Sequence, residues 1–332
     1  MLLCAGLGTR LGALSDERPK PLLPVCDVPI LRYGLALLEA AGLREVVINL
    51  HHRGDLIEHE LRSGHGGLDL RYSREEILLG TGGGIAAVRD WLTGGGEASF
   101  LVLNGKLVLD ADLADLARVH EAGGAEATML LREVPEAERY GVVDFIDDGA
   151  GLRVVGLRGR RAPGFVQCNN LRAGMFTGVH FVSPGLAARL PDGVSDVIAE
   201  AYIPALLEGR RIAARLHAGY FQEHSTPARY LEGNLALLAS PGAIRFPPAP
   251  LCGVDPGALV APTARLVEPF RIGEGAVIGE GAEIGPGTVI GRGARVLAGA
   301  RLARTVVWPD SVAGGDLHGA IVTPRGAVTV CE

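Results

Sequence analysis

The stretch MLLCAGLGTRLGALSDERPKPLLPV, residues 1–25, decides the fold of the N-terminal part of the chain. A short apolar run leads directly into a glycine-rich turn, where Gly6 and Gly8 lack a Cβ and allow backbone N–H groups to approach an anion. Arg10 and Lys20, the latter between two prolines, supply matching positive charges. The stretch therefore predicts a strand followed by a phosphate-binding turn, with a nucleoside triphosphate as the ligand.

The two common glycine-rich nucleotide-binding motifs fit this stretch less well. A dinucleotide-binding G-x-G-x-x-G pattern requires a third glycine, and Gly12 stands one residue too late for it. A Walker A loop requires Gly-Lys followed by Ser or Thr, which this stretch lacks. A purely structural turn from strand to helix would require neither Arg10 nor a lysine between prolines.

The two elements together resemble the sugar-1-phosphate nucleotidyltransferases, whose G-x-G-T-R and P-K-P elements stand here at residues 6–10 and 19–21. The resemblance is specific because two separated elements agree. It implies a Rossmann-like nucleotidyltransferase domain in which Arg10 and Lys20 are catalytic. It also implies a nucleotide-binding set, which consists of Ala5, Gly6, Gly8, Thr9 and Arg10 in this part of the chain.

Length and composition are typical of a soluble two-domain protein. The chain has 332 residues, of which 48% are hydrophobic and 21% charged, and its formal net charge is -6. This balance argues against nucleic acid as a partner, because binding to a phosphate backbone requires a basic face. The sequence has neither an apolar stretch of about 18 to 20 residues nor a signal-peptide pattern, so we expect no membrane partner and a cytoplasmic location. The scattered cysteines predict neither a disulfide framework nor a zinc site.

Helical and strand patterns alternate after the first stretch. Residues 31–41 predict an amphipathic helix. Strand patterns fall at residues 45–50, 68–72, 99–103 and 127–132. Helices between strands predict an α/β domain with a mostly parallel sheet, and in such a sheet the ligand binds at the carboxyl ends of the strands.

Ten six-residue repeats follow one another from Val254, each led by an apolar residue, with Trp308 leading the tenth. Such spacing predicts a short left-handed parallel β-helix of about three turns, in which the leading side chain fills a prism and a small fifth residue packs near each corner. A proline-rich stretch before the repeats predicts a linker. The predicted domains are residues 1–238, the linker 239–253 and the β-helix 254–332.

Two roles fit such a β-helix. Many β-helices of this kind are acyltransferases, which require a catalytic histidine, and His318 lies beyond the regular repeats. The interpretation we prefer is a scaffold that makes the chain a homo-oligomer, because the ends and flat sides of a short β-helix are normally covered. We then expect that a cut within residues 241–250 leaves a monomeric domain that still binds nucleotide.

A second glycine-rich segment, EEILLGTGGG at residues 75–84, resembles the part of the family fold beside the base and ribose. The resemblance implies that Glu75, Gly80 and Thr81 bind nucleotide. A carboxylate accepts hydrogen bonds and donates none, so Glu75 favours guanine over uracil; the alternative is a solvated loop charge. The chain looks most similar to mannose-1-phosphate guanylyltransferases, which implies GTP and mannose 1-phosphate as substrates, with N-acetylmuramate-1-phosphate uridylyltransferases as the alternative.

Further matches with the family lie on the sugar side. The segment YGVV at residues 140–143 resembles the sugar-side strand, and the resemblance places Gly141, Gly178 and Arg160 at the sugar phosphate. Arg160 stands where the family has a lysine. Asn104 follows the predicted strand at residues 99–103 and is implied to bind nucleotide.

The chain departs from the family at the metal site. Where the family has Asn-Gly-Asp, whose aspartate binds the catalytic magnesium, this sequence has Asn104-Gly105-Lys106. The second family aspartate is Glu223 here, and Asp110 lies nearby in sequence, although its place before a helix is more typical of a cap. The resemblance thus implies Mg²⁺ held by Glu223 and Asp110, whereas the ammonium of Lys106, the third catalytic candidate, argues against the metal.

Two classes of function remain open at this point. The first is a sugar-1-phosphate nucleotidyltransferase, which transfers a nucleotidyl group from an NTP to a sugar 1-phosphate and releases pyrophosphate. The second is a non-catalytic relative that binds a nucleotide sugar and scaffolds an active partner through its β-helix. Both classes need the nucleotide pocket, so the residue at position 106 is what discriminates between them.

Overall fold

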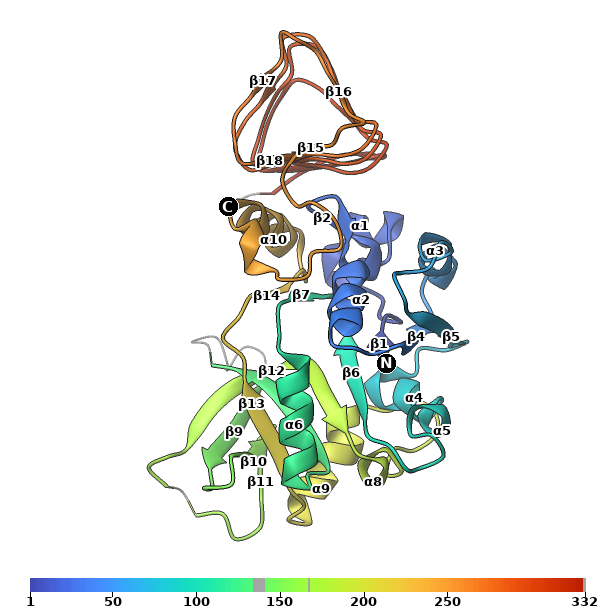
Figure 1. Cartoon of the computed structure of the whole chain (residues 1–332), viewed down its shortest axis with the longest axis vertical. Coiled ribbons are helices and arrows are strands. Elements are labelled where there is room, and N and C mark those ends of the chain that lie inside the picture. The colour runs from blue at the N-terminus through green and yellow to red at the C-terminus, as the bar shows by residue number, and fades with distance from the viewer. Residues whose placement is uncertain (134–140, 167, 331–332) are drawn as a thin grey trace. The chain divides into compact units, whose positions relative to one another are not determined.

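The computed structural model describes residues 1–133, 141–166 and 168–330, and the chain divides into two compact units (Figure 1). The first unit is assembled from residues 1–6, 38–105 and 111–219. The second unit is assembled from residues 7–37, 106–110 and 220–332. The compact units are therefore not divided at residue 238, where the sequence predicts a domain boundary.

The first unit is built around one mixed sheet. Its strands run in the order β11-β10-β13-β8-β12-β6-β1-β4-β5, and β9 pairs with both β10 and β12. The strands are β1 (Leu2–Leu3), β4 (Glu45–Leu50), β5 (Asp69–Arg74), β6 (Phe100–Asn104), β8 (Ala127–Arg132), β9 (Val142–Asp147), β10 (Leu152–Leu157), β11 (Arg160–Arg161), β12 (Arg172–Val182) and β13 (Ile212–Leu216). All four predicted strands are confirmed as β4, β5, β6 and β8.

Only part of this sheet is parallel, and the prediction of a mostly parallel sheet is wrong for the rest. Strands β6, β1, β4 and β5 are parallel neighbours, and so are β8 and β13. In contrast, β12 is antiparallel to β6, β8 and β9, and β10 is antiparallel to β9, β11 and β13. Strands β9 and β10 are joined by the turn at residues 148–151, and strands joined by so short a turn have to be antiparallel.

Short helices accompany the sheet. They are α3 (Gly54–Glu60), α4 (Gly80–Ala86), α5 (Arg89–Leu92), α6 (Leu113–Gly123), α8 (Pro184–Ala187) and α9 (Ile203–Leu207). Asp112 caps the N-terminus of α6, where its carboxylate accepts a hydrogen bond from the Asp115 N–H at 2.8 Å. Gly124, with a φ of 51°, caps the C-terminus. Within the ranges that the structure describes, no helix is both long and apolar enough to cross a membrane.

The second unit contains a parallel β-helix whose coils trace a triangle in Figure 1. Its three sides are the strand ladders β15-β18-β21-β24-β27, β16-β19-β22-β25 and β17-β20-β23-β26, and β28 is antiparallel to β27. The strands are β15 (Gly253–Val254), β16 (Leu259–Val260), β17 (Arg265–Leu266), β18 (Phe270–Ile272), β19 (Val277–Ile278), β20 (Glu283–Ile284), β21 (Thr288–Ile290), β22 (Arg295–Val296), β23 (Arg301–Ala303), β24 (Val306–Val307), β25 (Val312–Ala313), β26 (Asp316–His318), β27 (Ala320–Thr323) and β28 (Gly326–Thr329). The left-handed sense of the coil stays a prediction.

The repeat pattern explains the core of this β-helix. Leu259 pairs with Val277 and Val277 with Arg295, so strands three repeats apart lie side by side, as the spacing predicts. The leading residues of the central repeats fill the prism, and small residues at position five pack beside them. These buried residues are Ile272, Ile278, Ile284, Ile290, Val296 and Leu302 in the leading positions, and Ala276, Ala282, Ala294 and Ala300 in the fifth.

The prediction of ten repeats in unbroken register is wrong at the C-terminal end. Val289 pairs with Val306, one residue short of three repeats, and later coils are shorter still. The chain turns sharply at Arg304, whose φ is 49°, so Val307 enters the prism core and Trp308 points out of it. Every side carries at least four strands, so the β-helix has about four turns rather than about three.

The N-terminal stretch packs on the β-helix within the second unit. Its elements are the 3₁₀ turns η1 (Thr9–Leu11) and η2 (Lys20–Leu22), the helices α1 (Ala13–Glu17) and α2 (Ile30–Ala40), and the strands β2 (Pro24–Val25) and β3 (Val28–Pro29). One buried apolar cluster combines Leu11 and Tyr33 from this stretch with Trp308 and Ile321 from the β-helix. A cut within residues 241–250 would remove the β-helix side of this cluster. That such a cut leaves a monomeric domain that still binds nucleotide stays a prediction.

Candidate active site

A two-stranded ladder places the residue that departs from the family pattern. Strands β7 (Leu107–Leu109) and β14 (Phe221–Glu223) pair antiparallel, with Leu107 opposite Glu223. Lys106 comes directly before β7, and its Nζ lies 2.7 Å from Oε1 of Glu223. The backbone register therefore determines that these two side chains meet.

Two further cations approach the same carboxylate. Nζ of Lys20 lies 3.6 Å from Oε1 of Glu223, and a guanidinium nitrogen of Arg10 lies 3.9 Å from it. The side chains of Glu223 and Lys20 are only 13% and 8% exposed, whereas that of Arg10 is 65% exposed. We call Arg10, Lys20, Lys106 and Glu223 the cation cluster. With one carboxylate among three cations, it carries a net positive charge that suits an anionic ligand.

The charges of the cluster shift one another's pKa values. Burial acts to raise the pKa of Glu223, but the charge and hydrogen bond of Lys106, together with the other two cations, outweigh burial and hold that pKa below its ordinary value. Burial and then repulsion from Lys106 lower the pKa of Lys20 to about 8, although the Glu223 carboxylate acts in the opposite direction. At neutral pH, Glu223 is ionised and Lys20 is mainly protonated.

The cation cluster does not fit Mg²⁺, the ion that the family resemblance implies. Mg²⁺ requires several oxygen ligands in octahedral geometry, and Oε1 of Glu223 already pairs with Lys106. Asp110 pairs instead with Arg245, whose Nε lies 2.8 Å from Oδ2. Across the described part of the chain, no three His, Cys, Asp or Glu side chains are grouped to hold a metal ion. The two predicted metal ligands, Glu223 and Asp110, thus pair with different cations, Lys106 and Arg245.

The glycine-rich turn places Arg10 in the cation cluster. Gly8 has a φ of 67°, which favours glycine, and the chain then forms η1, which holds Thr9 and Arg10. A Cβ on Gly8 would lie 3.5 Å from the Cβ of Lys20, so the turn passes close to the lysine segment. The structure thus brings Gly8, Thr9, Arg10 and Lys20 together in the second unit, while the buried Ala5 and its neighbour Gly6 belong to the first unit.

Glu75 has an environment that the sequence does not predict. Its side chain is buried, Oε1 accepts a hydrogen bond from Nδ2 of Asn49 at 2.7 Å, and Oε2 accepts one from the Leu79 N–H at 2.9 Å. Oδ1 of Asn49 accepts in turn from the Cys4 N–H at 2.7 Å. The alternative of a solvated charge is therefore wrong for Glu75, whereas its neighbour Glu76 is exposed. Because both carboxylate oxygens of Glu75 already accept hydrogen bonds within the protein, they support a structural role, and its contact with guanine stays a prediction. Glu75 joins the ends of β1 and β4 to the start of α4.

The glycines of residues 80–84 allow close packing between two segments of the first unit. Gly80 has a φ of 75°, and a Cβ there would collide with the carbonyl oxygen of Ser195. The Thr81 hydroxyl accepts a hydrogen bond from the Val197 N–H at 3.0 Å. This geometry gives Gly80 and Thr81 a role in holding α4, in addition to the predicted role in binding nucleotide.

The predicted sugar-side residues also lie in the first unit. Gly178 has a φ of 86°, and a Cβ on it would collide with the side-chain amide of Asn104, so the structure brings these two residues together. Arg160 and Gly141 are exposed, the former in β11. Tyr140, the first residue of the YGVV segment, lies outside the described residues.

Comparison with known proteins finds relatives for both the N-terminal part of the chain and the β-helix. Residues 1–158 match the nucleotidyl transferase family model, and residues 254–304 match the bacterial transferase hexapeptide model with six repeats. The mannose-1-phosphate guanylyltransferase of Mycobacterium tuberculosis is 32% identical over 278 residues, which cover 80% of this chain and 72% of that protein. The catalytic subunit beta of mannose-1-phosphate guanylyltransferase from Danio rerio is 31% identical over 271 residues, which cover 80% of this chain and 71% of that protein.

The chain belongs to the nucleotidyl transferase family. Its enzyme class is that of the sugar-1-phosphate nucleotidyltransferases, as the G-x-G-T-R and P-K-P elements predict. The hexapeptide match of this nucleotidyl transferase ends at residue 304, where the coils of the β-helix become shorter than three repeats.

Sequence reasoning missed two polar residues of this nucleotidyl transferase. Asn49 is the one uncharged polar residue in the otherwise apolar run VVINL, and a polar residue at the end of a buried strand is a signal that could have found it. His224 is fully buried beside Tyr230, and burial lowers its pKa to about 3, so it is neutral at physiological pH. Its place directly after Glu223 gave no such signal.

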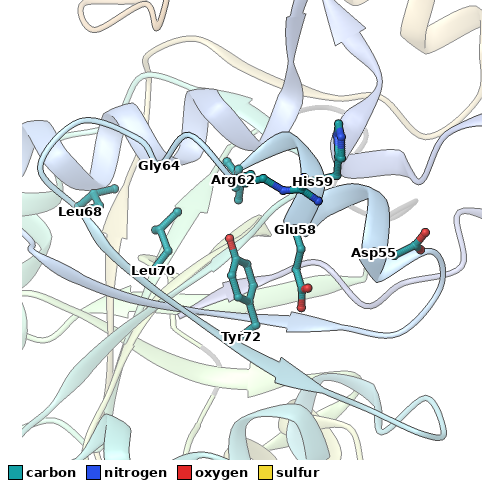
Figure 2. Close-up of a pocket in the computed structure, with 9 residues that line it drawn as sticks. Asp55, Glu58, His59, Arg62, Gly64, Leu68, Leu70 and Tyr72 are labelled. Atoms are coloured by element: carbon teal, nitrogen blue, oxygen red, sulfur yellow. The ribbon is translucent and has the colours of Figure 1, made fainter.

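A separate groove lies between α3 and β5 of the first unit. It has a volume of about 570 Å³, and its lining includes Asp55, Glu58, His59 and Tyr72 (Figure 2). Glu58 pairs with Arg74 at 2.6 Å. None of the residues that line the groove is among the predicted site residues, so it plays no part in the function proposed below.

Glu75→Gln distinguishes a structural carboxylate from one that binds the base. Glutamine has one acceptor oxygen, while Asn49 and Leu79 both donate to Glu75, so one donor loses its partner. We expect the free energy of unfolding of the first unit to fall by about 1–3 kcal/mol and the preference between GTP and UTP to stay unchanged. Urea unfolding and titration calorimetry measure the two quantities.

Glu76→Gln, at the exposed neighbouring position, is the matched control and should change neither quantity. A Glu75→Gln variant of normal stability whose base preference moves toward UTP would contradict the structural role and restore the guanine-binding interpretation.

Proposed function

We propose that this nucleotidyl transferase converts GTP and mannose 1-phosphate to GDP-mannose and pyrophosphate, and that its cation cluster receives the triphosphate in place of Mg²⁺. The observation that carries the proposal is the ammonium of Lys106 at 2.7 Å from Glu223, with Lys20 and Arg10 beside the same carboxylate. The choice of GTP and mannose 1-phosphate is supported by the names of relatives that are 31% and 32% identical.

The proposed reaction is a single in-line displacement. An oxygen of the sugar 1-phosphate attacks the α-phosphorus of GTP, the bond from that phosphorus to the β-phosphate oxygen breaks, and pyrophosphate leaves with the electron pair. No covalent intermediate with the protein forms, so catalysis consists of positioning and charge neutralisation. Arg10 and Lys20 hold the triphosphate and the leaving pyrophosphate, and Lys106 neutralises part of the charge at the α-phosphate.

An ammonium replaces only part of what a metal ion supplies. Lys106 at about 4 Å from Mg²⁺ would repel it by about 8 kcal/mol at an effective dielectric constant near 20, so the metal is strongly disfavoured at Glu223. The ammonium cannot bind two phosphate oxygens in fixed octahedral directions as Mg²⁺ does. We therefore infer a slow enzyme whose nucleotide binding depends little on Mg²⁺.

Lys106→Asp should increase both turnover and its dependence on Mg²⁺. The gain should be large, since one preorganised charge-stabilising group is typically worth about 10² to 10³ in rate. Pyrophosphate release from GTP and mannose 1-phosphate, with and without Mg²⁺, measures the effect. Lys106→Met removes the ammonium without adding a carboxylate and is the control that should not gain activity.

Fast Mg²⁺-dependent turnover by the unmodified chain would contradict the role given to Lys106. Two other outcomes favour the alternatives that the sequence left open. Faster turnover with UTP and an amino-sugar phosphate would favour a uridylyltransferase. A chain that binds GTP or a GDP-sugar tightly but releases no pyrophosphate in any variant would favour a non-catalytic relative.

The affinity for GTP should fall as the pH rises through the pKa of Lys20. That pKa is lowered to about 8 in the free chain, so the ammonium that binds phosphate is present below this pH and lost above it. Lys20→Arg stays charged throughout and should remove the fall. Titration calorimetry from about pH 7 to about pH 9 tests this, and an unmodified chain that shows the same pH profile as Lys20→Arg would exclude Lys20 as the titrating group.

We also propose that the chain is a homo-oligomer through its β-helix. On the side formed by β16, β19, β22 and β25, Leu259 in the first strand is 67% exposed and Val312 in the last strand is 56% exposed. Leu297, directly after β22, is 50% exposed. Large exposed apolar side chains on one side of a β-helix favour an interaction surface there. Light scattering should find more than one chain per particle, and fewer for the variant Leu259→Ser with Val312→Ser. A monomeric unmodified chain would contradict the proposal.

A further inference from the structure

We propose that the β-helix positions the phosphate-binding lysine, and that Asp27 and Thr323 are positioning residues for Lys20. The proposal rests on the proposed function in one respect, namely that Lys20 binds phosphate. It is carried by the contacts of residues 17–27, which surround Lys20 in the sequence and attach to the β-helix or to α10 (Pro227–Ala239) at several points within the second unit.

The residues before Lys20 attach to the last coils of the β-helix. The hydroxyl of Thr323, at the end of β27, donates a hydrogen bond to Oε1 of Glu17 at 2.6 Å. The guanidinium carbon of Arg18 lies 5.7 Å from the centroid of the Trp308 ring, within the range of a cation–π interaction. The chain directly before Lys20 is therefore attached to the β-helix.

The residues after Lys20 attach through a buried aromatic pair. The Tyr230 hydroxyl donates to the carbonyl oxygen of Pro24 and accepts a hydrogen bond from Nε1 of Trp308 at 3.0 Å. Oδ1 of Asn234 accepts from the Cys26 N–H at 2.8 Å. Tyr230 and Trp308 are fully buried, so this link between the β-helix and the backbone beside Lys20 is shielded from water.

Asp27 makes the third attachment, at the turn between β2 and β3. Its Oδ1 accepts a hydrogen bond from the Arg292 N–H at 2.9 Å, and a Cβ on Gly273 would collide with its other oxygen. Gly273 follows β18 and Arg292 follows β21, so the carboxylate sits against two neighbouring coils. Burial raises the pKa of Asp27 to about 6, as expected for a carboxylate enclosed by these coils.

These attachments hold the lysine segment from three directions. They restrict the chain on both sides of Lys20, and a group that is fixed before binding loses less conformational freedom when the ligand arrives. The β-helix is therefore a structural part of the phosphate site of this chain, in addition to the role in assembly proposed above.

Two matched pairs of variants test the positioning role. Asp27→Gly removes the carboxylate at a position whose φ of 67° glycine tolerates, while Asp27→Asn keeps an acceptor for the Arg292 N–H. Thr323→Val removes the hydroxyl that binds Glu17, while Thr263→Val removes a hydroxyl that accepts from the Gly281 N–H inside the β-helix.

We expect Asp27→Gly and Thr323→Val to weaken GTP binding by about 3- to 10-fold, as for the loss of one hydrogen bond, and to speed amide hydrogen exchange in residues 17–27. Asp27→Asn and Thr263→Val should change neither. Calorimetry and mass spectrometry of the full-length variants measure the two effects.

Hydrogen exchange requires no ligand, so it tests the positioning role even if the unmodified chain binds no GTP. Failure of the unmodified chain to bind GTP would contradict only the proposed function. Unchanged exchange in residues 17–27 of Asp27→Gly and Thr323→Val would overturn the inference, and so would equal changes in all four variants.

Discussion

The ion pair between Lys106 and Glu223 is the interaction on which the site depends. It follows from the register of β7 and β14, and a shift of one residue in that pairing would turn one of the two side chains to the opposite face. Without Glu223, three cations would face one another and repel. The carboxylate is thus the counter-ion that allows a dense positive site to exist in the free chain, and a bound triphosphate can replace it in that role.

The chain that leaves Glu223 continues into α10, and this connection explains why the β-helix and the N-terminal stretch share one core. Thr226 caps the N-terminus of α10, where its hydroxyl accepts a hydrogen bond from the Arg229 N–H at 3.2 Å. Tyr230, in the same helix, accepts a hydrogen bond from Nε1 of Trp308. The short segment of residues 223–230 therefore contains both a member of the cation cluster and a residue that bonds to the β-helix. This placement is the basis for our proposal that the repeat domain supports the site directly.

Local periodicity made much of the fold predictable. The strands at residues 45–50 and 127–132 and the hexads of the central coils follow from patterns a few residues long, and the structure confirms them. The failures arise from contacts between distant segments. The partner of Glu75 is Asn49 in another strand, and Trp308 leaves the prism because one coil is a residue shorter than the pattern. No local pattern encodes either event.

The cation cluster was predictable in part. Family resemblance placed Arg10, Lys20, Lys106 and Glu223 at one site, but it assigned Glu223 to a metal rather than to Lys106. Whether a divalent cation binds at Glu223 is measured most directly by an EPR titration of the free chain with Mn²⁺, which favours the same oxygen ligands as Mg²⁺. With Lys106 paired to Glu223, the spectrum should stay that of free Mn²⁺. A bound ion at one per chain that disappears in the variant Glu223→Gln would contradict this expectation.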